Sequence, residues 1–309
     1  MKDIYDLIII GGGPAGITAG IYSARQKLNT LLITKAFGGQ ITRKAVEIEN
    51  YPGFKQISGF DLIQKFTEHL KKFRIETLQD EAVKVKKKEN FFLILTKTRK
   101  KLQAKSVIVA SGADPRPLEV PGEKKFIGKG VSYCTACDAP FFTKKTVAVV
   151  GGGNSGFEAA TALSNWAEKV FILETGLKVR ADKENQERVK KTGKVEILTN
   201  VVVKQIKGKE FVESIIYRDK KLKKEKTLPL QGIFIEIGSQ PATSIVKGLV
   251  DFNKKDEIII NHHTGETKTI GLFAAGDVSD CSFKQIVVAA GEGAKAALTA
   301  SNYLQKFNL

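Results

Sequence analysis

The stretch "YDLIIIGGGPAGITAGIYSARQ" at residues 5–26 decides the fold, because an apolar β-branched run, a glycine-rich turn and an alanine-rich helical pattern follow one another in it. The stretch "TVAVVGGGNSGFEAATALSNWA" at 146–167 repeats the same order. A further apolar run follows each of them, at 29–34 and at 169–174. A strand, a tight turn, a helix and a second strand make a βαβ unit. The sequence therefore predicts an α/β protein with two Rossmann-like, three-layer nucleotide-binding domains.

The rest of the chain fits two such domains, the second inserted into the first. Residues 82–110 and 201–237 alternate and turn like small β-meanders. Gly/Pro-containing stretches at 113–117 and 238–243 are typical of linkers. The tail at 244–309 holds a strand and a helix, which is too little for an α/β domain of its own. We therefore expect a discontinuous first domain and a continuous second domain, with boundaries at 1–114 plus 244–309 and at 115–243.

The composition is typical of a folded protein that does not cross a membrane. Of 309 residues, 42% are hydrophobic, and no apolar run approaches the roughly 18 to 20 residues that span a bilayer. The first apolar run leads into glycines instead of a cleavage site, so we interpret it as a strand and not as a signal peptide. Three cysteines are too few for a disulfide-rich secreted scaffold. We expect a cytoplasmic protein with no membrane partner.

The net charge of +17 raises the question of a nucleic-acid partner. The lysines cluster in "KVKKKEN" at 84–90, "KTRKK" at 97–101 and "RDKKLKKEK" at 218–226, each between strand-like runs. Aromatic residues are not interleaved with them as a base-stacking surface requires. We interpret the clusters as solvated hairpin tips and expect no nucleic-acid partner; a non-catalytic, basic flavoprotein that binds nucleic acid is the remote alternative.

The first glycine triplet is Gly11, Gly13 and Gly16. In a strand–turn–helix context the first glycine permits the tight turn, the second lets the backbone approach a pyrophosphate, and the third lets helix and strand pack closely. The free N–H groups at the helix start favour the phosphates. The following strand ends in Thr34 and Lys35, so the usual acid that binds a ribose hydroxyl is missing.

The second triplet is Gly151, Gly153 and Gly156, and here the next strand does end in an acid, Glu174. A carboxylate at that place bonds the ribose hydroxyls of NADH and repels the 2′-phosphate of NADPH. The nearby cations Lys178 and Arg180 would soften that preference. The alternative for Glu174 is an ordinary solvated strand end.

The sequence "SYCTACDAPFF" at 132–142 carries two of the three cysteines, Cys134 and Cys137, and Cys281 is isolated. A zinc site needs two more ligands, which are not nearby, so we predict no metal. Positions i and i+3 meet on one face of a helical turn, so the pair can close a disulfide. Asp138 either hands a proton to a leaving thiolate or caps the helix. Two nucleotide sites and a dithiol together indicate an electron relay through FAD from NAD(P)H.

On these residues the chain resembles the low-molecular-weight thioredoxin reductases, which are pyridine nucleotide-disulfide oxidoreductases. The matching motifs span nearly the whole chain and include "GGGPAG" at 11–16, "FGGQI" at 37–41, "IENYPGF" at 48–54, "ASGADPR" at 110–116, "YCTACDAPFF" at 133–142, "VVGGGNSG" at 149–156, "GLFAAGDV" at 271–278 and "KQIVVAAGEGAKAA" at 284–297.

The resemblance implies cofactor positions in both domains. For FAD these are Gly11, Gly13, Pro14, Ala15, Gly16, Gly39, Gln40, Asn50, Gly276, Asp277, Lys284, Gln285 and Ile286. For the nicotinamide cofactor they are Gly151, Gly153, Asn154, Ser155 and Glu174, with Lys178 and Arg180 beside them. The basic motif of NADPH-using members is replaced by Glu174-Thr175-Gly176, which favours NADH.

The resemblance also implies how the cysteines divide the work. Cys137 would face the flavin, Cys134 would attack the partner's disulfide, and Asp138 would donate the proton. It further implies a homodimer and a rotation of the nicotinamide domain on the two linkers. The common glycine after the Cys-Asp pair is Ala139 here, a departure without a clear consequence.

Several stretches, among them "GGGNSGFEAA" and "ADKENQERVK", are nearer to the flavoprotein subunit of alkyl hydroperoxide reductase. That subunit carries an extra N-terminal disulfide domain, and this chain begins at the FAD strand. We therefore expect electrons to leave to a separate thioredoxin-like or glutaredoxin-like protein. An NADH-dependent reductase module for a peroxiredoxin is the alternative.

Overall fold

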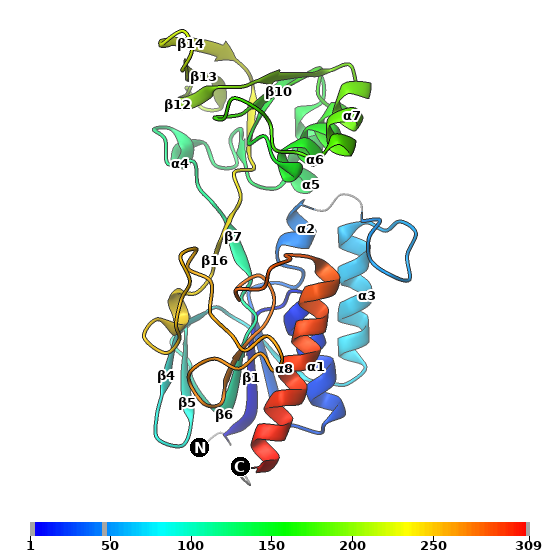
Figure 1. Ribbon diagram of the computed structural model, residues 1–309, viewed down its shortest axis with the longest axis vertical. Helices are drawn as coiled ribbons and strands as arrows, with labels where there is room; N and C mark the ends of the chain where they lie inside the picture. The colour runs from blue at the N-terminus through cyan, green and yellow to red at the C-terminus, as the bar shows by residue number, and fades with distance from the viewer. Residues whose placement is uncertain (1–3, 45–47, 307–309) are drawn as a thin grey trace. The chain divides into compact units, whose positions relative to one another are not determined.

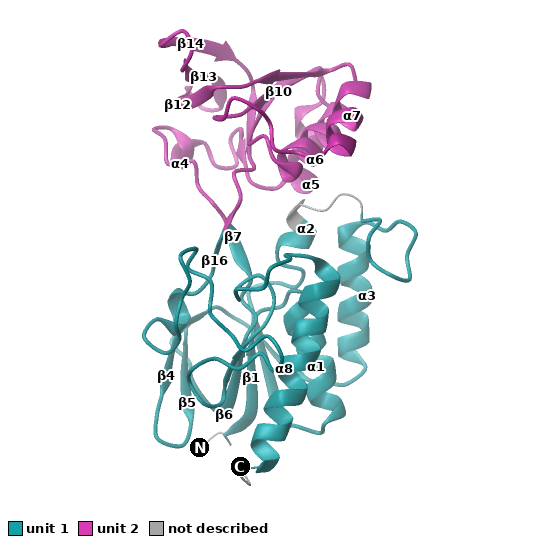
Figure 2. Cartoon of the chain, viewed as in Figure 1, with its two compact units in different colours: residues 1–114, 240–309 teal, residues 115–239 magenta. Residues whose placement is uncertain are grey.

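The computed structural model describes residues 4–44 and 48–306. The chain forms two compact units, coloured separately in Figure 2. Unit 1 comprises Met1–Asp114 and Gln240–Leu309, and unit 2 comprises Pro115–Ser239. The second unit is thus inserted into the first, and the return to unit 1 falls at 239/240, not at the predicted 243/244.

Unit 1 is built on a mixed seven-stranded sheet with the order β3-β2-β1-β6-β5-β4 and with β17 also paired to β6. Figure 1 labels strands β1, β4, β5 and β6 of this sheet. Strands β1, β2, β3, β6 and β17 are mutually parallel where they pair, and β4, β5 and β6 form an antiparallel meander. The strands are β1 (Tyr5–Ile10), β2 (Thr30–Thr34), β3 (Glu76–Gln79), β4 (Ala82–Lys87), β5 (Phe92–Thr96), β6 (Lys101–Val109) and β17 (Leu272–Ala274).

Strand β1 shows why this sheet is covered on both sides. Leu7 and Ile9 belong to the core under the helices, and Ile8 and Ile10 belong to the core on the meander side. Successive side chains of a strand point to opposite faces, so a strand buried on both faces reads as an unbroken apolar run. The helical elements of unit 1 are α1 (Pro14–Arg25), α2 (Gln40–Lys44), α3 (Gly59–Lys71), η2 (Ser244–Val246) and α8 (Ile286–Lys306).

Unit 2 repeats this plan with a parallel five-stranded sheet of order β11-β10-β9-β15-β8. Helices pack on one face and a three-stranded antiparallel meander on the other, each over its own apolar core. The strands are β8 (Val131–Ser132), β9 (Thr146–Val150), β10 (Lys169–Leu173), β11 (Val195–Leu198), β12 (Val201–Gly208), β13 (Val212–Asp219), β14 (Lys224–Pro229) and β15 (Gly232–Ile235). The helical elements are α4 (Glu123–Phe126), α5 (Thr135–Asp138), η1 (Ala139–Phe142), α6 (Asn154–Ser164) and α7 (Lys183–Lys191). The predicted α/β fold with two three-layer nucleotide-binding domains is confirmed.

The chain passes between the units along two short strands that pair with each other, β7 (Ala113–Pro115) and β16 (Ser239–Pro241). Backbone bonds extend the pairing on both sides: Arg116 N donates to the Gly238 carbonyl and Ala242 N to the Gly112 carbonyl, each over 3.0 Å.

The lysine clusters lie at or next to the β4–β5, β5–β6 and β13–β14 connections, where hairpin tips were predicted. Within the described ranges, none of the helices combines the length and the hydrophobicity that a membrane span requires.

Candidate active site

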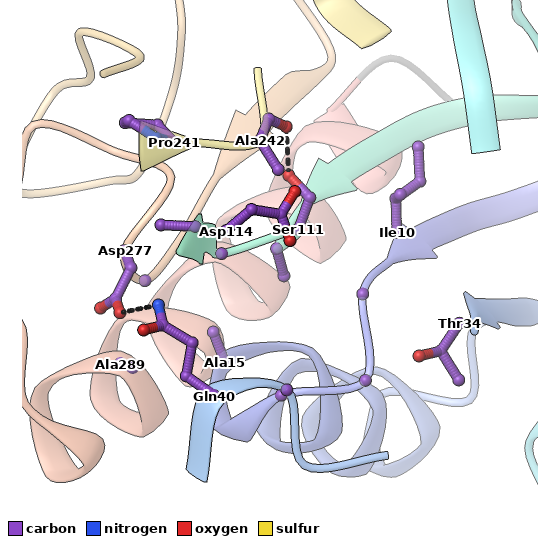
Figure 3. Close-up of a pocket in the computed structure, with 18 of the residues that line it drawn as sticks. Ile10, Ala15, Thr34, Gln40, Ser111, Asp114, Pro241, Ala242, Asp277 and Ala289 are labelled. Atoms are coloured by element: carbon purple, nitrogen blue, oxygen red, sulfur yellow. Dashed lines mark hydrogen bonds between the residues drawn. The ribbon is translucent and has the colours of Figure 1, made fainter. Parts of the chain in front are cut away.

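Unit 1 contains a cavity of about 840 Å³ (Figure 3). Its walls come from the carboxyl ends of four parallel strands of the sheet, β1, β2, β6 and β17. Ligands of open α/β sheets bind at these ends, and the volume lies in the range of cofactor sites. The cavity is therefore the candidate site for the first nucleotide.

The first glycine turn forms one end of this cavity. Gly11, Gly13 and Pro14 line it, and Gly13 is the N-cap of α1. A Cβ on Gly13 would meet no atom within 4 Å, so the backbone is open to a ligand there. A Cβ on Gly16 would lie 1.9 Å from the Gly11 carbonyl oxygen, so only glycine lets α1 close on the turn. Free N–H groups at an open helix start fit the pyrophosphate of FAD.

Most of the residues predicted for FAD line the cavity. They are Gly11, Gly13, Pro14, Ala15, Gly39, Gln40, Gly276, Asp277, Lys284, Gln285 and Ile286. The Gln40 side-chain amide donates to Asp277 Oδ2 over 3.4 Å (Figure 3). Gly16 lies behind the turn, and Asn50 does not line the cavity but donates to Gln285 Oε1 over 3.3 Å. The residues present fit the flavin nucleotide.

A charged group at the β2 end of the cavity was not foreseen. Lys35, Asp80 and Glu81 all line it, and Lys35 Nζ lies 3.0 Å from Glu81 Oε1. The hydrogen bond from Lys35 lowers the pKa of Glu81 against the opposing effect of burial. Thus an acid does stand near Lys35, but it comes from the residue before β4 and not from the end of β2. The pair "DE" at 80–81 directly before an apolar strand was the available signal.

The second glycine turn, in unit 2, is held by Glu174. This carboxyl group is 4% exposed; Oε2 accepts the Gly152 N–H over 2.8 Å, and Oε1 accepts the Gly176 N–H over 2.6 Å. Burial raises the pKa of Glu174, but these backbone bonds, the Thr175 hydroxyl and the Arg180 charge outweigh it and the pKa is lowered. Glu174 is therefore an ionised support of the turn, not a solvated strand end.

The other residues predicted for the nicotinamide cofactor surround the same turn. Asn154 and Ser155 are exposed at the start of α6, and Asn154 Oδ1 accepts the Asp182 N–H over 2.8 Å. Lys178 and Arg180 are exposed, and Arg180 N donates to the Gly152 carbonyl over 2.7 Å. Unit 2 thus gathers all of these predicted residues at the carboxyl ends of β9 and β10.

The two neighbouring cysteines form a disulfide. The Cys134–Cys137 bond is 2.07 Å long, and the Cα atoms are 5.3 Å apart. Cys134 is the N-cap of α5 and its sulfur accepts the Cys137 N–H over 3.2 Å. Cys137 is exposed and Cys134 is half-buried in unit 2. Ala139 follows with φ −51° and ψ −41°, an ordinary helical conformation, so the loss of the family's glycine causes no backbone strain.

Two carboxyl groups anchor the segment that carries the disulfide. Asp138 Oδ2 accepts the Ser132 hydroxyl over 2.6 Å. Buried Glu123 accepts the Leu118 N–H over 2.7 Å and also the hydroxyl of Tyr133, the residue before Cys134. Burial and the Glu123 carboxylate raise the pKa of Tyr133, which therefore stays a donor. Ser132 and Glu123 were missed, because nothing in their spacing marks them.

Cys281 is a half-buried thiol in unit 1, and its sulfur lies 3.4 Å from the Phe283 carbonyl. Burial, followed by the Glu292 carboxylate, raises the pKa of this thiol. A thiol with a raised pKa is a poor nucleophile. In the described part of the chain, no three His, Cys, Asp or Glu side chains form a group that could hold a metal.

Comparison with known proteins agrees with this geometry. The family model described as "Pyridine nucleotide-disulphide oxidoreductase" matches residues 5–293. The chain belongs to this family. The solved thioredoxin reductase of Lactococcus lactis superposes with a TM-score of 0.92 at 36% identity, over 98% of this chain and 99% of that one.

Two curated relatives have a similar sequence identity to this chain. The "NADH dehydrogenase" of Bacillus subtilis is 40% identical over 303 residues, and an alkyl hydroperoxide reductase subunit of Staphylococcus epidermidis is 38% identical over 304 residues. Both alignments cover 98% of this chain but 59% and 60% of the relative, so the chain spans well under two thirds of their length. As a member of the family, the chain shares the fold of the solved thioredoxin reductase and carries the Cys134–Cys137 disulfide described above.

Proposed function

We propose that the protein passes electrons from NADH, in preference to NADPH, through FAD to the Cys134–Cys137 disulfide and from there to a separate thioredoxin-like or glutaredoxin-like protein. The observation that carries this proposal is the disulfide itself. It lies partly exposed in the same unit as the second glycine turn, and a carboxyl group, Asp138, stands next to it.

FAD, when bound, would supply the redox chemistry that links a two-electron hydride donor to a disulfide. The remaining steps belong to the chain. The Cys134 thiolate attacks a sulfur of the partner's disulfide, the S–S bond breaks, and the leaving thiolate takes the proton of Asp138. The Cys137 thiolate then attacks Cys134 in the mixed disulfide, which closes the Cys134–Cys137 bond and releases the second partner thiolate. Two electrons have left the dithiol, and both partner sulfurs are reduced.

The preference for NADH rests on Glu174. Its Oε2 accepts one backbone N–H and keeps a second lone pair, which can accept a ribose hydroxyl. A 2′-phosphate would meet an ionised carboxylate at that point. The name of one curated relative, the "NADH dehydrogenase", supports NADH as the donor. The name of the other, the alkyl hydroperoxide reductase subunit, supports the alternative partner, a peroxiredoxin.

Steady-state assays with the FAD-loaded protein test the proposal. Purified oxidised thioredoxin, glutaredoxin and peroxiredoxin are offered separately, with NADH or NADPH as donor. We expect the highest kcat/KM with NADH and a thioredoxin-like or glutaredoxin-like disulfide. Turnover with peroxiredoxin alone would favour the second candidate, a peroxiredoxin reductase module. A clear preference for NADPH would mean that Lys178 and Arg180 decide the donor instead of Glu174.

A further inference from the structure

A buried hydroxyl group joins the attacking cysteine to the proton donor. Ser132 is 4% exposed, and its Oγ donates to Asp138 Oδ2 over 2.6 Å. The same oxygen accepts the Cys134 backbone N–H over 3.0 Å. The Cys134 carbonyl oxygen lies 3.3 Å from it and is an alternative acceptor for the hydroxyl proton. One short side chain therefore contacts both the Asp138 carboxyl group and the backbone of Cys134, whose thiol the proposed reaction uses.

The local fold holds this hydroxyl in place. Ser132 is the last residue of β8 and pairs in register with Phe234 of β15, so its backbone is fixed by the sheet. The chain then turns into α5, whose Asp138 N–H donates to the Cys134 carbonyl over 3.1 Å. This turn brings the Asp138 carboxyl group back onto the end of β8.

We propose that Ser132 is a positioning residue that keeps Asp138 hydrogen-bonded in both of its protonation states. A hydroxyl has one proton to donate and two lone pairs to accept with. When Asp138 is ionised, the Ser132 proton goes to Oδ2. When Asp138 is protonated, the acid donates to one Ser132 lone pair, the Cys134 N–H occupies the other, and the Ser132 proton turns to the Cys134 carbonyl.

The consequence concerns the transfer of the proton to the partner. Asp138 loses its proton to the leaving partner thiolate and becomes a carboxylate. The Ser132 hydroxyl then rotates, so that its proton moves from the Cys134 carbonyl to Oδ2 of Asp138. No covalent bond to Ser132 forms or breaks, and Asp138 regains its proton from water. The new carboxylate thus receives a strong, charge-assisted hydrogen bond at the moment it forms. This inference rests on the proposed function, because it assigns the proton of the partner step to Asp138.

The test separates the two half-reactions in Ser132→Ala, Asp138→Asn, the double variant and wild type, all loaded with FAD. Stopped-flow bleaching of the flavin by NADH reports the hydride step, and reduction of purified oxidised thioredoxin reports the partner step. In Ser132→Ala we expect an unchanged hydride step and a partner step at least about tenfold slower, the loss that removal of one hydrogen bond to a charged group produces. Ser132→Thr, which keeps a hydroxyl, restores most of that rate.

The double variant distinguishes positioning from a general structural effect. If Ser132 acts through Asp138, adding Ser132→Ala to Asp138→Asn slows the partner step by less than about twofold, because the interaction is already lost. The inference would be overturned if the rate reductions of the two single variants multiplied in the double variant, or if Ser132→Ala carried out the partner step at the wild-type rate. Either result would leave the proposed function standing. Wild-type protein whose flavin is bleached by NADH but that reduces neither thioredoxin nor glutaredoxin would overturn both.

The matched control is Ser164→Ala. Ser164 is 6% exposed in the same unit, and its hydroxyl donates to the Thr161 carbonyl over 2.6 Å within α6. The substitution removes a buried hydroxyl of the same kind, but one that bonds to the Thr161 carbonyl and not to Asp138. We expect wild-type rates for both half-reactions. A slowed partner step in this variant as well would attribute the Ser132 effect to the loss of any buried hydroxyl and would overturn the inference.

Discussion

Thr34 and Glu174 occupy the same place in the two units, at the end of the second strand and against the middle glycine of the turn. A Cβ on Gly12 would lie 2.5 Å from Thr34 Oγ1, and a Cβ on Gly152 would lie 2.5 Å from Glu174 Oε2. In unit 1 the side chain is a hydroxyl that donates to the Ala36 carbonyl, and in unit 2 it is a buried carboxylate. One structural position is therefore filled by two chemistries, of which the second places a negative charge against the glycine turn.

The separate roles proposed for the two cysteines give a prediction for Cys137→Ser. We expect the flavin of this variant to be bleached by NADH at the wild-type rate, because the hydride step precedes the disulfide. We expect turnover of a protein disulfide to be lost, because Cys137 can no longer resolve the mixed disulfide. Stopped-flow and steady-state assays measure the two steps. Cys281→Ser is the control and should keep both, whereas partner turnover in Cys137→Ser would refute its assigned role.

Asp80 gives a prediction about acid stability. Hydrogen bonds from the side chains of Thr98 and Thr96 lower its pKa from 3.8 to about 2. A lowered pKa means that the ionised form stabilises the fold above pH 3.8, and that this contribution is lost as the pH falls toward 2. In Thr98→Val we expect a lower free energy of unfolding at pH 5 to 7, with a difference from wild type that shrinks below pH 3.8.

Urea unfolding across this pH range measures the effect. Thr77→Val is the control, because its hydroxyl contacts the Ile75 carbonyl and no acid is involved in that bond. Its difference from wild type should not change with pH. A Thr98→Val difference that stayed constant down to pH 2.5 would show that the bond does not act through the ionisation of Asp80.

At the scale of the strand–turn–helix elements, two glycines of one turn should respond differently to the same methyl group. A Cβ on Gly156 would lie 1.9 Å from the Gly151 carbonyl oxygen, whereas a Cβ on Gly153 would meet nothing within 4 Å. Gly156→Ala should therefore destabilise unit 2 by about 1–3 kcal/mol, the usual cost of overpacking. Gly153→Ala should leave the stability unchanged and raise the KM for NADH, because the methyl group enters the space of the phosphates. Urea unfolding and steady-state kinetics measure both, and equal losses of stability would contradict the assignment.

The sequence predicted these elements well because their signals are local. Glycine spacing, the apolar runs and the i, i+3 cysteines act within single turns, and they gave the two domains and the disulfide. Contacts between distant positions were missed: Lys35 meets Glu81 only because β2 ends and β4 begins at the same cavity. The hydrogen bond of Ser132 to Asp138 depends on how α5 folds back onto β8. The unit boundary was placed four positions late because β16 is defined by its pairing with β7, which no local pattern encodes.

At the scale of the whole molecule, the adjacent connections predict that unit 2 can be removed. Ala242 N donates to the Gly112 carbonyl over 3.0 Å, so the two cut ends of unit 1 lie side by side. Replacing 115–239 by a short Gly/Ser linker between Asp114 and Gln240 should give a protein that still binds FAD. Its flavin should not be bleached by NADH at the wild-type rate, because the second glycine turn is gone. Absorbance of the purified protein and stopped-flow mixing measure both; absence of bound flavin would show that unit 1 does not fold alone.

The insertion of one unit into the other also sets an order of events on the ribosome. Residues 115–239 are continuous, so unit 2 has its whole sheet available before the last part of the chain has been translated. Unit 1 can be completed only later, because its contacts join segments that precede and follow the inserted unit in the sequence. Strand β17 pairs with β6, and α8 packs against α1. The flavin cavity takes its walls from both pieces, Ile10–Asp114 and Gln240–Ala289. The nascent protein can therefore acquire its dithiol segment early, whereas the cavity is complete only after the start of α8 has emerged.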